Sequence, residues 1–218
     1  MRYVVEMNEQ GRRQFLRTAL VGMAGVAVGG APLTRAVALP VQPNAMPPVG
    51  ISPGLMQKAL SAFQRHGMLI GQRRVMAIAD FTAASATPRF HILNLEDGHN
   101  QPLLVAHGKG SDPEHSGWVQ QFSNIPGSEA TSSGAYVTGD SYFGQHGFSR
   151  RLNGLDPEND QAEARAIVIH AAWYVSQDMA LEKGKIGRSQ GCFAFSDRDI
   201  GNVMWRLPPG TLIYAGKA

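Results

Sequence analysis

The 218-residue sequence predicts a mainly β domain with a few helices, an α+β fold. Short runs rich in β-branched and apolar residues recur between turn residues, whereas few segments carry apolar residues at helical spacing. A composition of 43% hydrophobic and 17% charged residues is ordinary for one globular domain with its own core. Because no unbroken run of 18 apolar residues occurs, we predict no membrane span in the mature protein.

Residues 1–38 show the ordered features of a signal peptide. The charged stretch GRRQFLR at 11–17 is followed by a mild, Gly-rich apolar run, and AVA at 36–38 has the small residues of a cleavage site. The consecutive arginines resemble a twin-arginine export signal. We therefore expect folding in the cytoplasm followed by export to the periplasm.

Residues 39–52 predict a linker, because their four prolines favour extended backbone. The folded domain is expected at 53–218. Removing the signal takes five of the 20 basic and two of the 17 acidic residues, which leaves fifteen of each. The mature protein then has no net charge and no basic patch, so its composition does not predict nucleic-acid binding. The sequence gives no indication of the oligomeric state.

The domain is expected to begin with a helix. Ser52 is placed as its N-cap and Pro53 as its first residue, and the helix is expected to end near Gly67. Its apolar side chains have helical spacing and predict one packed face: Leu55, Met56, Ala59, Leu60 and Phe63.

Three β candidates follow the helix, at residues 73–81, 89–95 and 102–107. Turn residues at 96–98 separate the second from the third. We expect these three strands to form an antiparallel meander.

Residues 108–130 form a long polar stretch that contains four glycines. Loops of this length in a domain are usually functional or mobile, and we expect this one to line or cover a cleft. His107 and His115 lie near its ends, but no ligand cluster with recognisable metal spacing surrounds them. We predict neither a metal nor a cofactor.

The chain then returns to strand patterns. Residues 131–138 predict a strand, 142–151 a Gly-containing turn region with His146, and 156–163 an acidic surface connection. Near the C-terminus, SDRD at 196–199 resembles a capping box. The helix expected behind it has a stripe of Ile200, Val203, Met204 and Leu207, ends at the sequence PPG, and precedes a last strand at 211–214.

The candidate chemistry lies between residues 167 and 195. The run IVIH at 167–170 is apolar and β-branched until its last residue, which predicts a buried strand with His170 at its end. The only cysteine, Cys192, lies 22 residues further along. A contact between them would require neighbouring strands joined by a loop. Such a pair can be held as thiolate and imidazolium, the reactive form of a cysteine nucleophile.

A structural role is the alternative for both residues. A lone cysteine is most often a small buried hydrophobe, and a histidine at a strand end is often structural. In an oxidising compartment a single cysteine cannot form an internal disulfide, so Cys192 is either inert and buried or a working thiol.

Several ordered motifs resemble the murein L,D-transpeptidase catalytic-domain family of the YkuD-like class, in a branch whose central motif is S-x-G-C. They are VAHGKG at 105–110, FSNIPG at 122–127, GAYVTG at 134–139, IVIH at 167–170 and GRSQGC at 187–192. The resemblance covers roughly residues 77–216. It implies an L,D-transpeptidase-like β-sandwich catalytic domain.

The resemblance also implies a cysteine-dependent acyltransferase that acts on peptidoglycan stem peptides. Cys192 would attack the carbonyl between meso-diaminopimelate and the terminal D-alanine of a tetrapeptide stem, and His170 would act as base and then as acid. The backbone amides of Gly191 and Cys192 are candidate oxyanion donors. Ser189 would shape the turn.

The candidate substrate-binding residues are Tyr136, as a side-chain donor, together with Arg188 and Gln190. Three positions depart from the commonest pattern of the class, which has Gly after the histidine, His before Gly-Cys and Arg two residues after the cysteine. This chain has Ala171, Gln190 and Ala194 there. The function of the missing histidine must therefore be supplied differently.

Three functions stay open at this point. An L,D-transpeptidase needs a thiol and a site for an amine acceptor, whereas an L,D-carboxypeptidase or related murein hydrolase needs the thiol and access for water. A non-catalytic wall-binding module needs neither, and the presence of both His170 and Cys192 argues against it. The sequence does not separate the first two functions.

Overall fold

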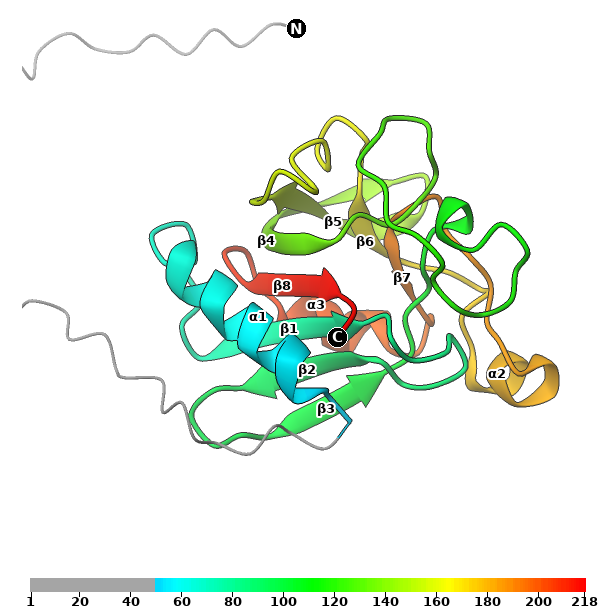
Figure 1. Cartoon of the computed structure of the whole chain (residues 1–218), viewed down its shortest axis with the longest axis horizontal. Helices are drawn as coiled ribbons and strands as arrows, with labels where there is room; N and C mark the ends of the chain where they lie inside the picture. The colour runs from blue at the N-terminus through cyan, green and yellow to red at the C-terminus, as the bar shows by residue number, and fades with distance from the viewer. Residues whose placement is uncertain (1–49) are drawn as a thin grey trace, which may run out of the picture. The chain divides into compact units, whose positions relative to one another are not determined.

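A computed structural model of the chain describes residues 50–218 (Figure 1). The predicted signal peptide at 1–38 and most of the predicted linker at 39–52 lie outside the described residues. The elements of the described part are α1 (Pro53–Arg65), β1 (Val75–Asp80), β2 (Phe90–Asn94), β3 (Asn100–Leu103), the 3-10 turn η1 (Lys109–Ser111), β4 (Gly134–Gly144), β5 (Gly147–Gly154), β6 (Val168–Ala171), α2 (Gln177–Lys183), β7 (Phe193–Phe195), α3 (Ile200–Arg206) and β8 (Leu212–Gly216).

The strands form one mixed sheet in the order β3-β2-β1-β8-β4-β5-β6-β7. The meander predicted for the first three strands is confirmed, because β1 pairs antiparallel with β2 and β2 with β3. The last strand of the chain, β8, enters the middle of the sheet, parallel to β1 and antiparallel to β4. The predicted α+β class is therefore confirmed.

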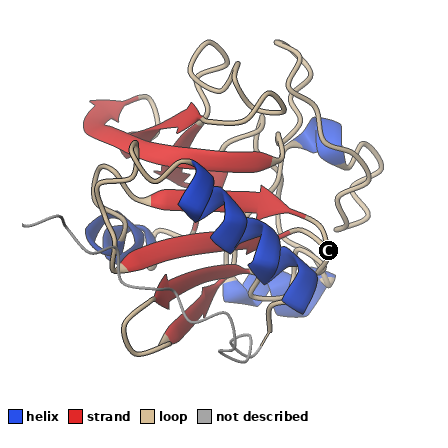
Figure 2. Cartoon of the chain, turned by 60° about the vertical axis from the view of Figure 1, so that its left-hand side comes forward, coloured by secondary structure: helices blue, strands red, loops and turns tan. Residues whose placement is uncertain are grey.

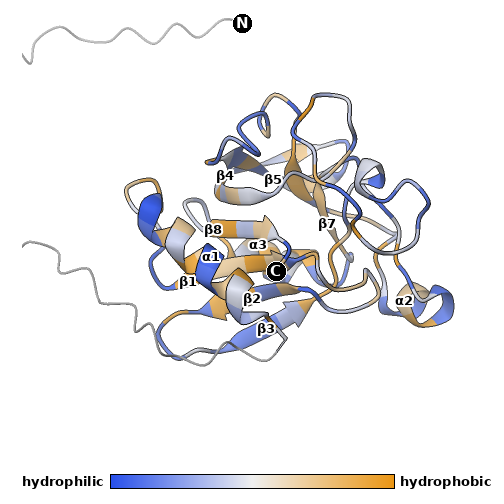
Figure 3. Ribbon diagram, in the orientation of Figure 1, coloured by the Kyte–Doolittle hydropathy of each residue, from blue (hydrophilic) through white to orange (hydrophobic). Residues whose placement is uncertain are grey.

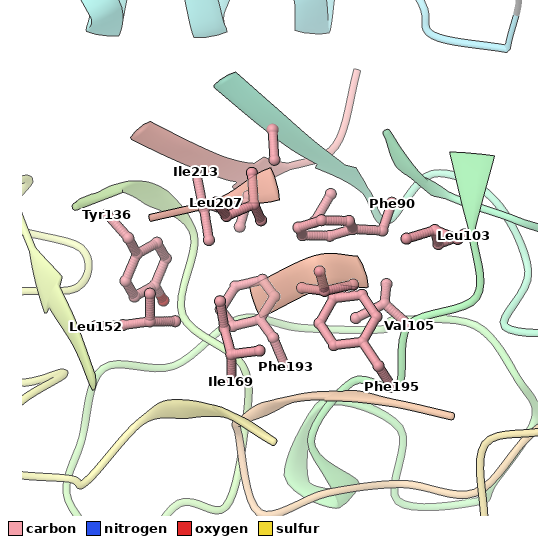
Figure 4. Close-up of a cluster of buried hydrophobic side chains, with 14 of the residues drawn as sticks. Phe90, Leu103, Val105, Tyr136, Leu152, Ile169, Phe193, Phe195, Leu207 and Ile213 are labelled. Atoms are coloured by element: carbon pink, nitrogen blue, oxygen red, sulfur yellow. The ribbon is translucent and has the colours of Figure 1, made fainter. Parts of the chain in front are cut away.

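The predicted sandwich is made by this single sheet folding over itself. Phe90 of β2 and Phe195 of β7 come from strands far apart in the sheet order, yet their ring centroids lie 4.8 Å apart in an edge-to-face contact. Figure 4 shows the buried side chains that fill the space between the two halves. A bridge between Ala106 and Ala194 also links the segment after β3 to β7, so the sheet comes close to closing.

Helices α1 and α3 cover opposite faces of β1 and β8 (Figure 2). Leu55 and Ala59 of α1 pack with Met76 and Ile78 of β1. The alternate residues of β1 belong instead to the cluster that contains Val203 of α3. This division follows from the period of two in a strand, which sends successive side chains to opposite faces.

The N-cap prediction for α1 is confirmed, since Ser52 Oγ accepts a hydrogen bond from the Leu55 N–H at 3.2 Å. In the motif before α3, the N–H of Asp199 donates to Ser196 Oγ at 3.1 Å, and this hydroxyl donates to the Asp199 carboxylate. Figure 3 shows mostly apolar residues along β1 and β8 and polar residues along β3 at the sheet edge, where exposed backbone groups favour them.

Three local predictions need correction. Strand β3 begins at Asn100 and ends at Leu103, earlier than the predicted 102–107. Most of the predicted turn region 142–151 is strand, because β4 and β5 continue to Gly144 and from Gly147 in a long hairpin. The sequence analysis also missed α2, although Ser176 caps its start and Gly184, at φ 64°, ends it. In the described part of the chain, no helix is long and apolar enough to cross a membrane.

Candidate active site

The residues before Cys192 form a tight turn held by Ser189. The Ser189 hydroxyl donates to the Cys192 carbonyl at 2.7 Å and accepts the N–H of Gly191 at 3.1 Å. Gly191 has a φ of +112°, a conformation that favours glycine. A Cβ at Gly191 would also lie only 2.7 Å from the carbonyl oxygen of Ala130. The expectation that Ser189 shapes the turn agrees with this geometry.

The predicted loop at 108–130 packs directly against this turn. The N–H of Ser189 donates to the His107 carbonyl at 2.9 Å, and the N–H of Lys109 donates to the Ser189 carbonyl at 2.8 Å. A Cβ at Gly108 would lie 2.3 Å from the Glu129 carbonyl oxygen, so the backbone approach requires glycine there. The loop therefore forms a wall of the site.

His170 and Cys192 come from neighbouring segments of the sheet. Strands β6 and β7 are parallel, and His170 pairs with Ala194, two residues beyond Cys192. Cys192 lies in the turn just before β7, and among the described residues no hydrogen bond joins its thiol to the His170 imidazole. The thiol hydrogen is directed at the Ala166 carbonyl, with an S···O distance of 3.6 Å. Catalytic hydrogen bonds often form only once substrate is bound.

A backbone carbonyl fixes the tautomer of His170. The ring nitrogen Nδ1 lies 2.8 Å from the Ala171 carbonyl oxygen, which can only accept. Nδ1 therefore carries the proton, and Nε2 keeps the lone pair that a general base needs. The side chain is nearly fully buried, at 3% exposure, so the ring is held in one orientation.

Burial sets the resting protonation of the pair. It raises the pKa of the Cys192 thiol, and the Val168 N–H and the Arg165 charge offset this only in part. Burial also lowers the pKa of His170, helped by the neighbouring His146 and opposed by the bond to Ala171. At neutral pH the pair therefore rests as thiol and neutral imidazole, not as the ion pair that the sequence suggested.

The predicted donors for an oxyanion are only partly available. The Gly191 N–H is already bonded to Ser189 Oγ, which leaves the Cys192 N–H as the candidate from that pair. Tyr136 is 0% exposed and lies within the core (Figure 4), and its hydroxyl donates to the Ser132 carbonyl at 2.9 Å. This placement makes Tyr136 a core residue and does not support its predicted contact with substrate.

The other two predicted binding residues, Arg188 and Gln190, lie on either side of Ser189 in the turn before Cys192. Arg188 donates from Nη1 to the carbonyls of Asp112 and Pro113, the latter at 3.0 Å, and so ties the turn to the loop. Gln190 is exposed to solvent. A contact of either side chain with substrate stays a prediction.

The sequence analysis did not single out Arg165 or assign a role to His146. The Arg165 guanidinium reaches four acceptors in residues 123–132 and lies beside Gly191. His146, on the turn between β4 and β5, stacks on His170 with ring centroids 4.4 Å apart and planes at 24°. No periodic signal marks either residue.

Tyr174 is the phenol on the partly exposed side of the site. It follows β6, and burial together with the Cys192 charge raises its pKa to about 12. Its side chain is half-buried, unlike that of Tyr136. Tyr174 is therefore better placed than Tyr136 to meet a ligand.

A buried polar network supports the loop from behind. Arg89 and His107 are both 0% exposed, and Arg89 Nη2 lies 2.6 Å from His107 Nδ1. Since a guanidinium can only donate, Nδ1 accepts and the proton of His107 is on Nε2, 3.3 Å from an oxygen of Asp112. Burial and the Arg89 charge lower the pKa of His107 to about 4. The ring is therefore neutral at physiological pH.

Taken together, these groups can perform nucleophilic acyl transfer. They provide a partly exposed thiol, a buried base with a fixed tautomer and a backbone donor beside the sulfur. Within residues 50–218, no group of three or more His, Cys, Asp or Glu side chains is arranged to hold a metal ion.

The sequence was compared with known families and proteins. The model of the L,D-transpeptidase catalytic domain (YkuD_2) matches residues 49–215, most of the chain. In the comparison with curated proteins, none matches.

Solved structures of several L,D-transpeptidases are similar in part. One from Mycobacterium smegmatis has 12% identity and a TM-score of 0.41 over 66% of this chain and 58% of that chain. L,D-transpeptidase 3 from Mycobacterium tuberculosis, in complex with a faropenem-derived adduct, has 12% identity and a TM-score of 0.39 over 65% and 60%. The helical cell shape determining protein Pgp2 from Campylobacter jejuni has 11% identity and a TM-score of 0.41 over 69% and 53%. The chain spans less than two thirds of the length of each.

Proposed function

The chain belongs to the L,D-transpeptidase catalytic-domain family, and from that premise we propose that it transfers acyl groups between peptidoglycan stem peptides through a Cys192 thioester. The family supports a peptidoglycan-related enzyme. The residues of the site support the thioester route.

In the first half-reaction, Cys192 attacks the carbonyl between meso-diaminopimelate and the terminal D-alanine of a tetrapeptide stem. His170 Nε2 takes the thiol proton as the carbon–sulfur bond forms, because both groups rest neutral. The oxyanion accepts the Cys192 N–H. His170 then gives the proton to the nitrogen of D-alanine, which leaves as the carbon–nitrogen bond breaks.

In the second half-reaction, an amine from another stem or a D-amino acid attacks the thioester carbonyl. His170 removes a proton from the amine and returns it to the sulfur, which restores the thiol and completes a new amide. Water as the attacking group would give the carboxypeptidase product instead. Which attacking group wins depends on how well the site excludes water from the thioester.

One observation carries the proposal. The bond from His170 Nδ1 to the Ala171 carbonyl leaves Nε2 unprotonated on β6, and β6 pairs with the strand that directly follows Cys192. A module that only binds the cell wall would not need a base with a fixed tautomer on the strand next to a partly exposed thiol.

The test is mass spectrometry of products from a disaccharide-tetrapeptide incubated with residues 39–218 and an added D-amino acid. We expect exchanged or cross-linked stems from the wild type and none from Cys192→Ala, with the same melting temperature. Trp205→Ala is the matched control, because Trp205 is 77% exposed on α3, away from the site. Tripeptide alone would favour the carboxypeptidase, and turnover by Cys192→Ala would refute the thioester mechanism.

Export by the twin-arginine route is part of the same proposal, since peptidoglycan lies outside the cytoplasm. A fusion of residues 1–52 to a reporter that is active only in the periplasm tests it. Replacing Arg12 and Arg13 by lysine should abolish reporter activity, and unchanged activity would contradict this route.

A further inference from the structure

Arg165 lies near the end of the connection between β5 and β6 and donates hydrogen bonds to several parts of one segment. Its Nη1 donates to the Ser123 carbonyl and to Ser132 Oγ, both at 2.7 Å. Its Nη2 donates to the Ala130 carbonyl at 2.5 Å and to Ser128 Oγ at 3.4 Å. One side chain thus holds residues 123–132 together.

These bonds decide what Arg165 can bind. A guanidinium has five N–H donors, and the four on Nη1 and Nη2 match the four protein acceptors. Recognition of a carboxylate by two parallel bonds needs a free pair of donors. Arg165 therefore does not take the carboxylate of a substrate in this arrangement, and its role concerns the protein itself.

The guanidinium lies directly beside the nucleophile turn. A Cβ at Gly191 would lie 3.2 Å from Arg165 Nη2 and 2.7 Å from the Ala130 oxygen that Arg165 binds. The next residue, Ala166, has a φ of 53° and presents its carbonyl to Cys192 Sγ. The connection between β5 and β6 therefore runs past the Cys192 sulfur at Ala166, the residue that directly follows Arg165.

Tyr136, Tyr174 and His170 are uncharged at neutral pH. Tyr136 and Tyr174 both have a pKa of about 12, the first through burial and the second through burial and the Cys192 charge. His170 rests neutral because burial lowers its pKa. Burial also lowers the pKa of Arg165, but a guanidinium stays protonated in proteins. Arg165 is the cation that acts on the sulfur.

We propose that Arg165 is a positioning residue for the nucleophile: its guanidinium holds residues 123–132 against the nucleophile turn and places a positive charge beside Cys192 as the thiol loses its proton. The inference rests on the proposed function for its catalytic meaning. The effect of Arg165 on the thiol pKa does not depend on substrate, so it can be measured without substrate.

The experiment measures alkylation of Cys192 by iodoacetamide across pH, followed by intact mass. Because Cys192 is the only cysteine, each added group reports on this site alone. The neutral variants Arg165→Gln and Arg165→Met should raise the thiol pKa and slow alkylation at neutral pH by about three- to tenfold, since a partly buried charge a few ångströms away shifts a pKa by up to about one unit. Two neutral variants are used so that the thiol pKa can still be measured if one of them fails to fold.

Two further variants separate the charge from the hydrogen bonds. Arg165→Lys keeps the charge, and Ser132→Ala removes one acceptor; both should lower the melting temperature while the thiol pKa stays near that of the wild type. Arg73→Met is the matched control, because Arg73 also donates to a carbonyl, that of Gly67, but is exposed and lies outside the site. An unchanged thiol pKa in the neutral variants, or an equal rise in Arg165→Lys, would overturn the proposal. Neither result would bear on the transfer of stems, which the product assay tests.

Discussion

The two sides of β7 are supported in opposite ways. Phe193 and Phe195 enter the apolar core between the halves of the sheet, where aromatic rings meet edge to face. The turn that carries Cys192 rests instead on hydrogen bonds of Ser189 and of the loop at 108–130, and Arg165 in turn binds that loop at Ala130. One strand therefore joins a hydrophobic core to a polar scaffold.

The apolar core and the hydrogen-bonded turn respond differently to substitution. Apolar packing has no direction and depends mainly on volume and area, so it fixes stability more than the position of any one atom. Hydrogen bonds to buried groups are directional, and a lost partner leaves an unsatisfied group behind. The polar scaffold is thus the part that sets the position and charge state of the thiol, whereas the core supplies the free energy that holds both in place.

The largest effect on stability is expected from breaking the core. Phe90→Ala removes a ring that is 0% exposed and in contact with Phe193 and Phe195, and should reduce the free energy of unfolding by about 3–5 kcal/mol. The thiol pKa in the folded protein should be unchanged. Denaturant unfolding and iodoacetamide titration measure the two quantities, with Trp205→Ala as an exposed control. A shifted thiol pKa would show that the core also tunes the site.

A smaller effect is expected from titrating the polar network. The folded-state pKa of His107, about 4, lies below the unfolded value of about 6.5, so the unfolded chain binds the proton first. Stability should therefore fall as the pH drops from about 6.5 to about 4, by on the order of 3 kcal/mol from this group.

His107→Asn tests this titration, because the amide oxygen can replace Nδ1 as acceptor for Arg89. The variant should be less stable than the wild type at pH 7, and the gap should narrow toward pH 4. His99→Asn, at an exposed histidine, is the matched control. A gap that stays constant with pH would mean that His107 is not held neutral. Denaturant unfolding at several pH values measures the gap.

The smallest effect is expected at the surface of the site. His146→Ala removes the ring that stacks on His170, which lessens both the burial of the base and the repulsion from a like charge. The pKa of His170 should rise, so the acid limb of kcat/KM should move to higher pH while stability changes by no more than about 0.5 kcal/mol. Trp205→Ala, the exposed control on α3, should leave the profile unchanged. An identical acid limb in both variants would leave His146 without a role in tuning the base.

The elements that follow from local patterns were predicted well. The cap at Ser52, the meander of β1 to β3 and the strand that ends near His170 depend on turn residues and periodicity within a few positions. The hairpin of β4 and β5 was taken for a turn region, because its glycines at 144 and 147 dominate the local signal. The pairing of the two strands around them overrides that signal.

The residues of the candidate site show the same difference between local sequence signals and long-range packing. Cys192, His170 and Ser189 were candidates from the sequence alone, since the type of each residue and its neighbours indicate the chemistry, and the catalytic roles of Cys192 and His170 stay a prediction. Tyr136 was misplaced because a tyrosine in a strand can face either the core or a cleft, and only the register of β4 decides which.

The sequence by itself determined the α+β class and the family, because these depend on local periodicity and on short motifs. The tertiary structure alone decided that β8 enters the middle of the sheet, that Arg165 lies beside the thiol and that His146 covers His170. These three contacts join residues far apart in the chain. Their partners are chosen by the packing of the whole domain, and no local pattern records that choice.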